Sequence, residues 1–139
     1  MPDRPVFIAA MNSAPQPFLS GIGQIAVTVA DVSAATVFYR DVLGLRFLFS
    51  AGPNLAFLDA GGLRLMLTTP QGQGEAGKNS VLYFRAGELA AAYAAVVSRG
   101  ARPERPPALT ARMPDHELWM AFVCDPDGNL VGLMSEVRA

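Results

Sequence analysis

The five residues Asp-Pro-Asp-Gly-Asn at positions 125–129 constrain the fold most, because every one of them favours a turn. Proline fixes φ, aspartate and asparagine bond their own backbone, and glycine accepts a positive φ. Apolar runs at 119–124 and 130–134 flank this cluster, so the segment predicts a β-hairpin. Residues 55–67 also predict a β-hairpin, with one apolar run before and one after a Gly-Gly pair.

The similarity between the two hairpins extends to the residues that precede them. A β-branched strand at 25–29 precedes a helical run at about 32–43, and a strand at 81–84 precedes a helical run at about 88–99. A glycine follows each helical run, as is common at helix C-termini. We therefore predict an internal repeat of strand, helix and two or three further strands. An ordinary α+β domain with two chance hairpins is the alternative.

Three segments carry a resemblance to a known family. They are residues 24–31, the Phe-Tyr-x-x-x-Leu-Gly motif within 38–45, and residues 122–133 around the turn cluster. Over roughly residues 20–137, the chain resembles the vicinal-oxygen-chelate superfamily. This superfamily includes glyoxalase I, methylmalonyl-CoA epimerase, extradiol dioxygenases, fosfomycin-resistance enzymes and bleomycin-binding proteins.

The resemblance implies an α+β fold of two βαβββ modules, whose curved mixed sheet forms a concave ligand site, or cup, with the helices outside. Module one then spans 20–70, a linker spans 71–78, and module two spans 79–137. Residues 1–18 contain four prolines and are expected to form an irregular N-terminal arm. The fold does not by itself define a reaction, because one fold supports many activities.

Composition excludes several classes of function. The chain has 139 residues, a formal net charge of −1 and no basic patch, so we expect no nucleic-acid partner. No apolar run approaches the roughly 18 residues needed to span a bilayer, and residues 6–11 are too short for a secretory signal. Cys124 is the single cysteine, which excludes an intrachain disulfide. These features predict a cytoplasmic protein.

Residue types alternate along the first predicted strand, and this alternation indicates which side chains point to each face of the sheet. Ile25 and every second residue after it up to Val29 are β-branched and suit the helix-covered side. Gln24, Ala26 and Thr28 then point the other way, into the cup. Gln24 therefore matches a position that holds a metal ligand in many relatives.

Enzymes of the superfamily usually hold one divalent ion, with ligands near the start of the first strand and on the last strand of each module. The resemblance places Gln24, Met66 (or Leu65, if a bulge shifts the register), Ser80 and Gly132 at these positions. Glycine has no side chain, and methionine is a soft ligand unsuited to magnesium or manganese. One amide and one hydroxyl cannot hold a hard dication, so we predict neither a metal nor another cofactor.

Two further side chains are candidates for ligand contact. His116 could bind a ligand or act as a general base, since its ordinary pKa lies near 6.5. It could equally be a loop histidine bonded to Asp115 or Glu117. Trp119 could stack on a planar ligand, or it could pack in the core or the hairpin.

Other prominent residues are interpreted as structural. Phe38 and Tyr39 lie on the first predicted helix and are expected in the core. Cys124 has no nearby basic partner and is interpreted as a small hydrophobe. Residues 102–107 contain three prolines, which disfavour a central strand, so they predict an irregular connection.

The sequence thus predicts a small-molecule-binding protein that resembles the glyoxalase and bleomycin-resistance proteins, without the family metal. The alternatives are a metal-dependent lyase, isomerase or dioxygenase of the glyoxalase type, and a dimeric scaffold with a vestigial site. The expected partners are a small organic ligand and a second copy of the chain. The residues expected to line the ligand site are Gln24, Met66, Ser80, His116, Trp119 and Gly132.

Overall fold

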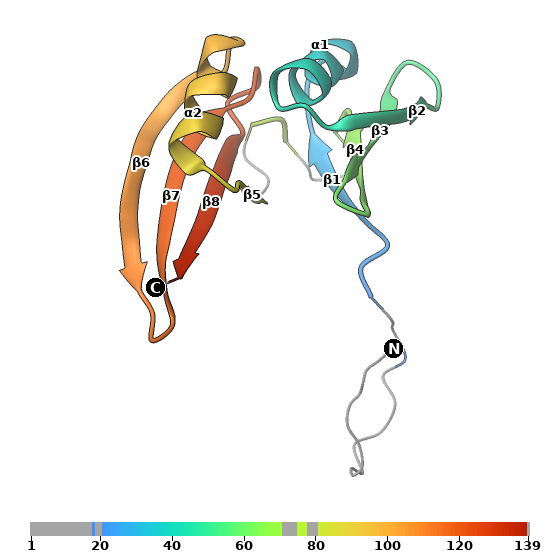
Figure 1. The fold of residues 1–139 in the computed structure, drawn as a ribbon. Helices are drawn as coiled ribbons and strands as arrows, with labels where there is room; N and C mark the ends of the chain where they lie inside the picture. The colour runs from blue at the N-terminus through green and yellow to red at the C-terminus, as the bar shows by residue number, and fades with distance from the viewer. Residues whose placement is uncertain (1–17, 19–20, 71–74, 78–80, 139) are drawn as a thin grey trace.

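The structure is a computed structural model that describes residues 18, 21–70, 75–77 and 81–138. The expected N-terminal arm, apart from Phe18, and most of the expected linker lie outside these residues. Figure 1 shows two units, each with one sheet and one helical segment.

Both units have the order strand, helix, strand, strand, strand, as the internal repeat predicts. Module one consists of β1 (Gln24–Thr28), α1 (Val32–Val37), the π-helical turn η1 (Phe38–Val42), β2 (Arg46–Ser50), β3 (Leu55–Ala60) and β4 (Leu63–Thr68). Module two consists of β5 (Leu82–Arg85), α2 (Leu89–Ser98), β6 (Arg102–Arg112), β7 (His116–Cys124) and β8 (Leu130–Arg138).

The two sheets have matching topology. Their strand orders are β1-β4-β3-β2 and β5-β8-β7-β6. In each sheet the first strand pairs in parallel with the last, and the remaining pairs are antiparallel. Both predicted hairpins are present, since β3–β4 and β7–β8 are antiparallel pairs. The α+β fold of two βαβββ modules is thereby confirmed.

The first helix changes its winding where the sequence predicts a continuous helix. Asp31 is its N-cap, and the carboxylate accepts a hydrogen bond of 3.1 Å from the backbone N–H of Ala34. The backbone N–H of Leu43 donates to the carbonyl of Phe38, which closes a wider π-type turn. Phe38 and Tyr39 are both buried, as expected. Among the described residues, neither helix is long and apolar enough to cross a bilayer.

The proline-rich segment that follows α2 corrects one prediction. Residues 102–107 were expected to be an irregular connection, but they belong to β6. β6 lies at the edge of its sheet and pairs only with β7, so its prolines remove no hydrogen bond to a second neighbouring strand. The register with β7 shifts between Pro103 and Arg105 and again between Arg105 and Ala108, which accommodates the prolines as bulges.

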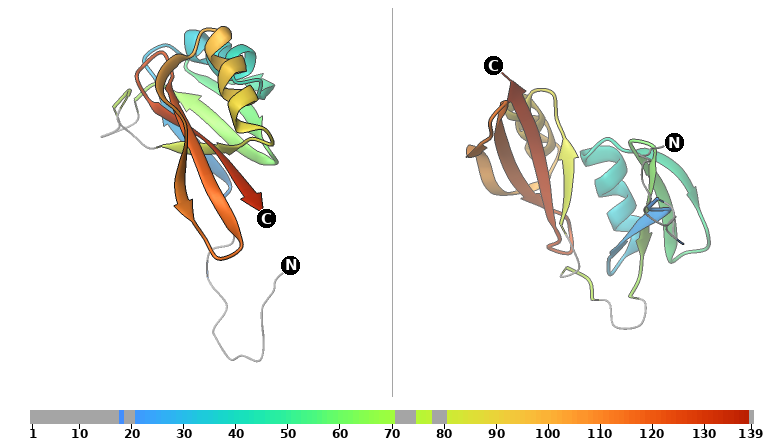
Figure 2. Two further views of the ribbon diagram at one scale, coloured as in Figure 1. Left: turned by 60° about the vertical axis from the view of Figure 1, so that its left-hand side comes forward. Right: turned by 90° about the horizontal axis from the view of Figure 1, so that it is seen from below.

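One apolar core joins the helix-covered faces of both sheets. Seen from below in Figure 2, α1 lies between the sheet of its own module and β5 of module two. The residues that meet in this core include Val27, Val29, Leu65 and Leu67 of module one with Ala121, Val123, Val131 and Leu133 of module two.

The phase of β1 agrees with the sequence. Val27 and Val29 are buried and Ile25 packs against the core, whereas Gln24 and Ala26 are exposed. Thr28 departs from the alternation in exposure because it is buried where the two modules meet.

A pair of substitutions tests this phase. We expect Gln24→Ala to lower the free energy of unfolding by about 0.5 kcal/mol or less, because the side chain is exposed. Ile25→Ala removes methyl groups packed against the core and should cost about 2 kcal/mol, the low end for such changes because Ile25 is half-buried. Denaturant unfolding of both variants measures the difference, and equal losses would contradict the strand phase.

Candidate functional site

Each sheet has one face away from the shared core, and these two open faces are the candidate site. Side chains alternate along a strand, so the residues between core positions point to the other side. We call Gln24, Ala26, Phe49, Phe57, Arg64 and Met66 the open face of module one. The open face of module two comprises Tyr83, Arg85, Arg105, Met120, Phe122, Gly132 and Met134.

Arg64 is the centre of the open face of module one. Its Nε donates to Oε1 of Gln24 at 3.0 Å, and its guanidinium carbon lies 5.4 Å from the ring centroid of Phe57. Phe57 stacks on Phe49, with centroids 4.6 Å apart and 25° between the ring planes. The Nε2 of Gln24 contacts the sulfur of Met66 at 3.6 Å. The face thus offers an aromatic pair beside an oriented guanidinium.

The open face of module two contains a similar arrangement. The guanidinium carbon of Arg105 lies 4.3 Å from the ring centroid of Phe122. Tyr83 meets Phe122 edge to face, with centroids 5.8 Å apart and an interplanar angle of 79°. A Cβ added to Gly132 would lie 2.5 Å from Cδ2 of Tyr83, so the tyrosine ring covers the space that a side chain at this position would take.

The strand register defines equivalent positions in the two modules. Met66 pairs with Ala26 of β1 and Phe57 of β3, while Gly132 pairs with Tyr83 of β5 and Phe122 of β7. The two ladders that include Met66 show no register shift, so Met66 and not Leu65 lies on the open face.

This register also gives the counterpart of Gln24 in module two. Gln24 lies two residues before Ala26, and the residue two before Tyr83 is Val81. The exposed Val81 is therefore the counterpart of Gln24, one residue beyond the position expected from the sequence. Ser80 itself lies outside the described residues.

The side chains at the four equivalent positions do not fit a divalent ion. Gln24 provides one amide oxygen, Met66 a thioether, and Val81 and Gly132 no donor. The ring of Tyr83 covers the last position. Within the described residues there is no group of three or more histidine, cysteine, aspartate or glutamate side chains that could hold a metal.

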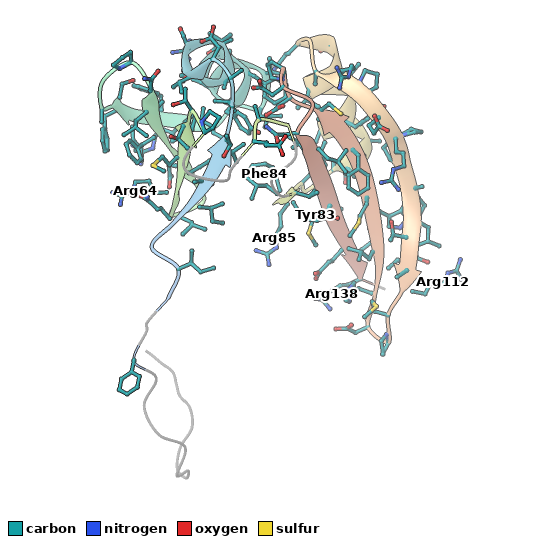
Figure 3. All side chains as sticks on the ribbon, turned by 180° about the vertical axis from the view of Figure 1, so that it is seen from behind. Arg64, Tyr83, Phe84, Arg85, Arg112 and Arg138 are labelled. Carbon is teal, nitrogen blue, oxygen red and sulfur yellow. The ribbon has the colours of Figure 1, made fainter. Side chains whose placement is uncertain are left out.

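His116 lies at the other end of the module-two sheet. It pairs with Arg138, whereas Phe122, six residues along β7, pairs with Gly132. Figure 3 shows Arg138 near the end of the sheet, away from Tyr83. The Nδ1 of His116 lies 2.7 Å from Oδ1 of Asp115, whose other oxygen accepts from Arg138 at 2.6 Å. These hydrogen bonds hold the pKa of Asp115 below its ordinary value. The structure does not bring His116 together with Gln24 or Gly132.

Trp119 lies on the helix-covered face of β7, where it packs against the core. Its indole N–H donates to Oε1 of Glu117 at 3.1 Å, which satisfies the only polar group of the side chain. It therefore faces away from Phe122 and Gly132, and it is absent from the open face of module two.

A cleft of about 600 Å³ lies between the modules, beside the unpaired edge of β5. Leu43, Leu45 and Ala60 of module one and Phe84, Val96 and Leu133 of module two line it. Its walls are mainly apolar, and most of them belong to the helix-covered side of the sheets.

The turn at residues 125–129 links the two modules, a role beyond that of the predicted hairpin. Asp125 is 2% exposed, and its carboxylate accepts four hydrogen bonds. They come from the Tyr39 hydroxyl at 3.0 Å, the Asp127 backbone N–H at 2.9 Å, the Asn129 backbone N–H at 2.8 Å and the Asn129 side chain at 2.8 Å. Burial raises the pKa of Tyr39, and the charge of Asp125 adds to this shift, so the hydroxyl remains a donor.

Two further hydrogen bonds extend this link. The side-chain amide of Asn129 donates to the carbonyl of Thr28 at 3.2 Å, and the carboxylate of Asp127 accepts from the backbone N–H of Ala30 at 3.0 Å. The turn therefore contacts both the end of β1 and the first helix of module one.

The comparisons with known proteins agree with this architecture. The family model described as Glyoxalase/Bleomycin resistance protein/Dioxygenase superfamily matches residues 21–133. The chain belongs to this superfamily. No curated protein matches the sequence.

Several solved structures share the fold. An integron cassette protein from the mobile metagenome of V. cholerae has 23% identity and a TM-score of 0.71, over 86% of this chain and 98% of that one. TnmS3, an antibiotic-binding protein from Streptomyces sp. CB03234, has 22% identity and a TM-score of 0.71, over 87% of this chain and 99% of TnmS3. A lactoylglutathione lyase from Agrobacterium tumefaciens has 23% identity and a TM-score of 0.66, over 84% and 94%.

Proposed function

We propose that this protein binds a small organic molecule in a cup shared by two copies of the chain, without a metal ion. In this arrangement, the open face of module one of one protomer covers the open face of module two of its partner. The observation that carries the proposal is the set of side chains on the two open faces, where aromatic rings and guanidinium groups lie beside Met66 and Gly132.

The position of α1 supports a cup shared between protomers. Because α1 lies between the sheet of module one and β5, the open face of module one points away from module two (Figure 2). A second copy is then needed to bring the two kinds of open face together. Phe49 and Tyr83, which are 47% and 48% exposed, would be covered by it. Each of β1 and β5 also has one unpaired edge that a partner could cover.

The ligand-binding reading accords with the description of TnmS3 as an antibiotic-binding protein. The lyase among the solved structures represents the competing enzymatic reading, in which a metal would be expected. We place the protein in the cytoplasm, where its single free cysteine, Cys124, would remain reduced.

Native mass spectrometry of freshly purified protein tests the proposal. We expect the mass of a dimer that carries a small molecule, because association buries the exposed aromatic side chains. Light scattering at micromolar concentration gives an independent mass. A monomer in both measurements would contradict the shared cup, and a dimer without any small-molecule ligand, even after a thermal-shift screen, would favour a scaffold.

Metal content provides a separate prediction. The protein should purify with far less than about one metal per chain, and a chelator should leave its melting temperature unchanged, because the four positions offer a single hard oxygen donor. Elemental analysis and thermal unfolding with and without chelator measure this. Stoichiometric metal together with a lower melting temperature in chelator would favour the enzymatic reading.

A further inference from the structure

The two modules repeat one arrangement of side chains on their open faces. In each, an arginine lies over a phenylalanine, and a second aromatic ring contacts that phenylalanine. The phenylalanines occupy equivalent positions, since they pair with Met66 and Gly132, respectively. The two sets are Arg64, Phe57 and Phe49 in module one, and Arg105, Phe122 and Tyr83 in module two.

The arginines of these sets differ from two other arginines on the same faces, Arg46 and Arg138, which pair with carboxylates. Arg46 pairs with Asp59 at 3.7 Å, and Arg138 pairs with Glu136 at 3.1 Å. Among the described residues, neither Arg64 nor Arg105 forms an ion pair with a carboxylate. The carboxylates of Asp59 and Glu136 are thus paired, whereas the exposed guanidinium groups of Arg64 and Arg105 have no carboxylate partner among the described residues.

The orientation of Arg64 leaves its binding groups available. Its Nε is engaged with Gln24, which fixes the plane of the guanidinium, while the two terminal nitrogens have no partner within the described residues. Such a planar group binds a carboxylate or sulfonate through parallel hydrogen bonds. The guanidinium carbon of Arg105 lies 4.3 Å from the ring centroid of Phe122, and its N–H groups form no ion pair with a carboxylate among the described residues.

We infer that the ligand of the cup is a planar aromatic molecule with an acidic group. Its ring stacks on the exposed aromatic side chains Phe49 and Tyr83, and its anion binds the guanidinium groups of Arg64 and Arg105. This inference rests on the proposed shared cup, because only that assembly brings the two sets into one cavity. Cationic ligands would meet two uncompensated positive charges and are disfavoured.

Three related compounds distinguish the contribution of the negative charge to binding from that of the aromatic ring. Calorimetric titration would compare 2-naphthoate, the neutral 2-naphthamide and the non-aromatic decahydro-2-naphthoate. We expect 2-naphthoate to bind at least about tenfold more tightly than each of the other two, since each of them lacks one of the two interactions. Equal affinity for 2-naphthoate and 2-naphthamide would contradict the inference that the ligand is an anion. Equal affinity for 2-naphthoate and decahydro-2-naphthoate would contradict the inference that an aromatic ring stacks in the cup.

Matched variants test whether 2-naphthoate binds in the cup. Arg64→Met and Arg105→Met should each weaken 2-naphthoate about tenfold and leave 2-naphthamide unchanged. Arg40→Met is the control, because Arg40 is an exposed arginine on η1, away from both open faces, and pairs with Asp41. Circular dichroism would verify that all three variants are folded.

Unchanged affinity for 2-naphthoate in both cup variants, or no binding of any probe to the unmodified protein, would overturn this inference. The proposed function is judged separately by native mass spectrometry, which requires none of the probes. A dimer that carries a neutral or non-aromatic molecule would therefore support the proposed function and contradict the inference that the ligand is an aromatic acid.

Discussion

Replacing Asp125 by alanine should lower the free energy of unfolding by roughly 3–5 kcal/mol, the largest loss that we expect from a single substitution outside the apolar core. The carboxylate is buried and accepts four hydrogen bonds, one of them from Tyr39 in the other module. Alanine would leave the Tyr39 hydroxyl and the Asn129 backbone N–H buried without an acceptor, and the Asn129 side-chain amide would keep only the Thr28 carbonyl. Urea unfolding at a fixed protein concentration measures the loss, because dimerisation makes stability concentration-dependent.

Asp127 provides the matched control within the same turn. Among the described residues, its carboxylate accepts one hydrogen bond, from the exposed backbone N–H of Ala30, so Asp127→Ala should cost only about 1 kcal/mol. The loss of unfolding free energy in Tyr39→Phe should lie between those of Asp125→Ala and Asp127→Ala, since this change removes one hydrogen-bond donor to Asp125 and adds no strain. Similar small losses for all three variants would show that the turn only closes a hairpin and does not join the modules.

The role of this turn shows where sequence reasoning ends. Proline, glycine and the short polar side chains identify a hairpin through local preferences, and the hairpin is present. The partner of Asp125 lies 86 residues away, in a helix where Tyr39 was expected only as a core residue. No local pattern encodes that contact, because it forms only when the two repeats pack against each other.

The open faces illustrate the same limit. In β1, the β-branched apolar residues Ile25 and Val27 alternate with Gln24 and Ala26, so the exposed position of Gln24 could be predicted. In β3, Phe57 lies between Ala56 and Leu58, and an uninterrupted apolar strand gives no phase. The aromatic and arginine sets were therefore missed. The ring of Tyr83 covers the space that a side chain at position 132 would take, and this accounts for a glycine there. The sequence showed the glycine but not the ring that covers it.

The sharpest test of the shared cup uses two variants that damage different modules. Arg64→Glu reverses a charge on the open face of module one, and Arg105→Glu does so in module two. Both side chains are exposed, so folding should survive. Each variant alone should lose nearly all binding of 2-naphthoate, because every cup then contains one carboxylate that repels the anion.

Co-expression of the two variants with different affinity tags should restore binding in the heterodimer. One of its cups would contain both substitutions, while the other would combine the intact module two of the Arg64→Glu chain with the intact module one of the Arg105→Glu chain. We expect about one 2-naphthoate per heterodimer, against about two per unmodified dimer, by calorimetric titration of doubly purified protein. If each cup were built within a single chain, both cups of the heterodimer would carry one damaged face, and no binding would return. Restored stoichiometry would therefore establish that the ligand site belongs to the pair of chains, because neither variant contains an intact cup of its own.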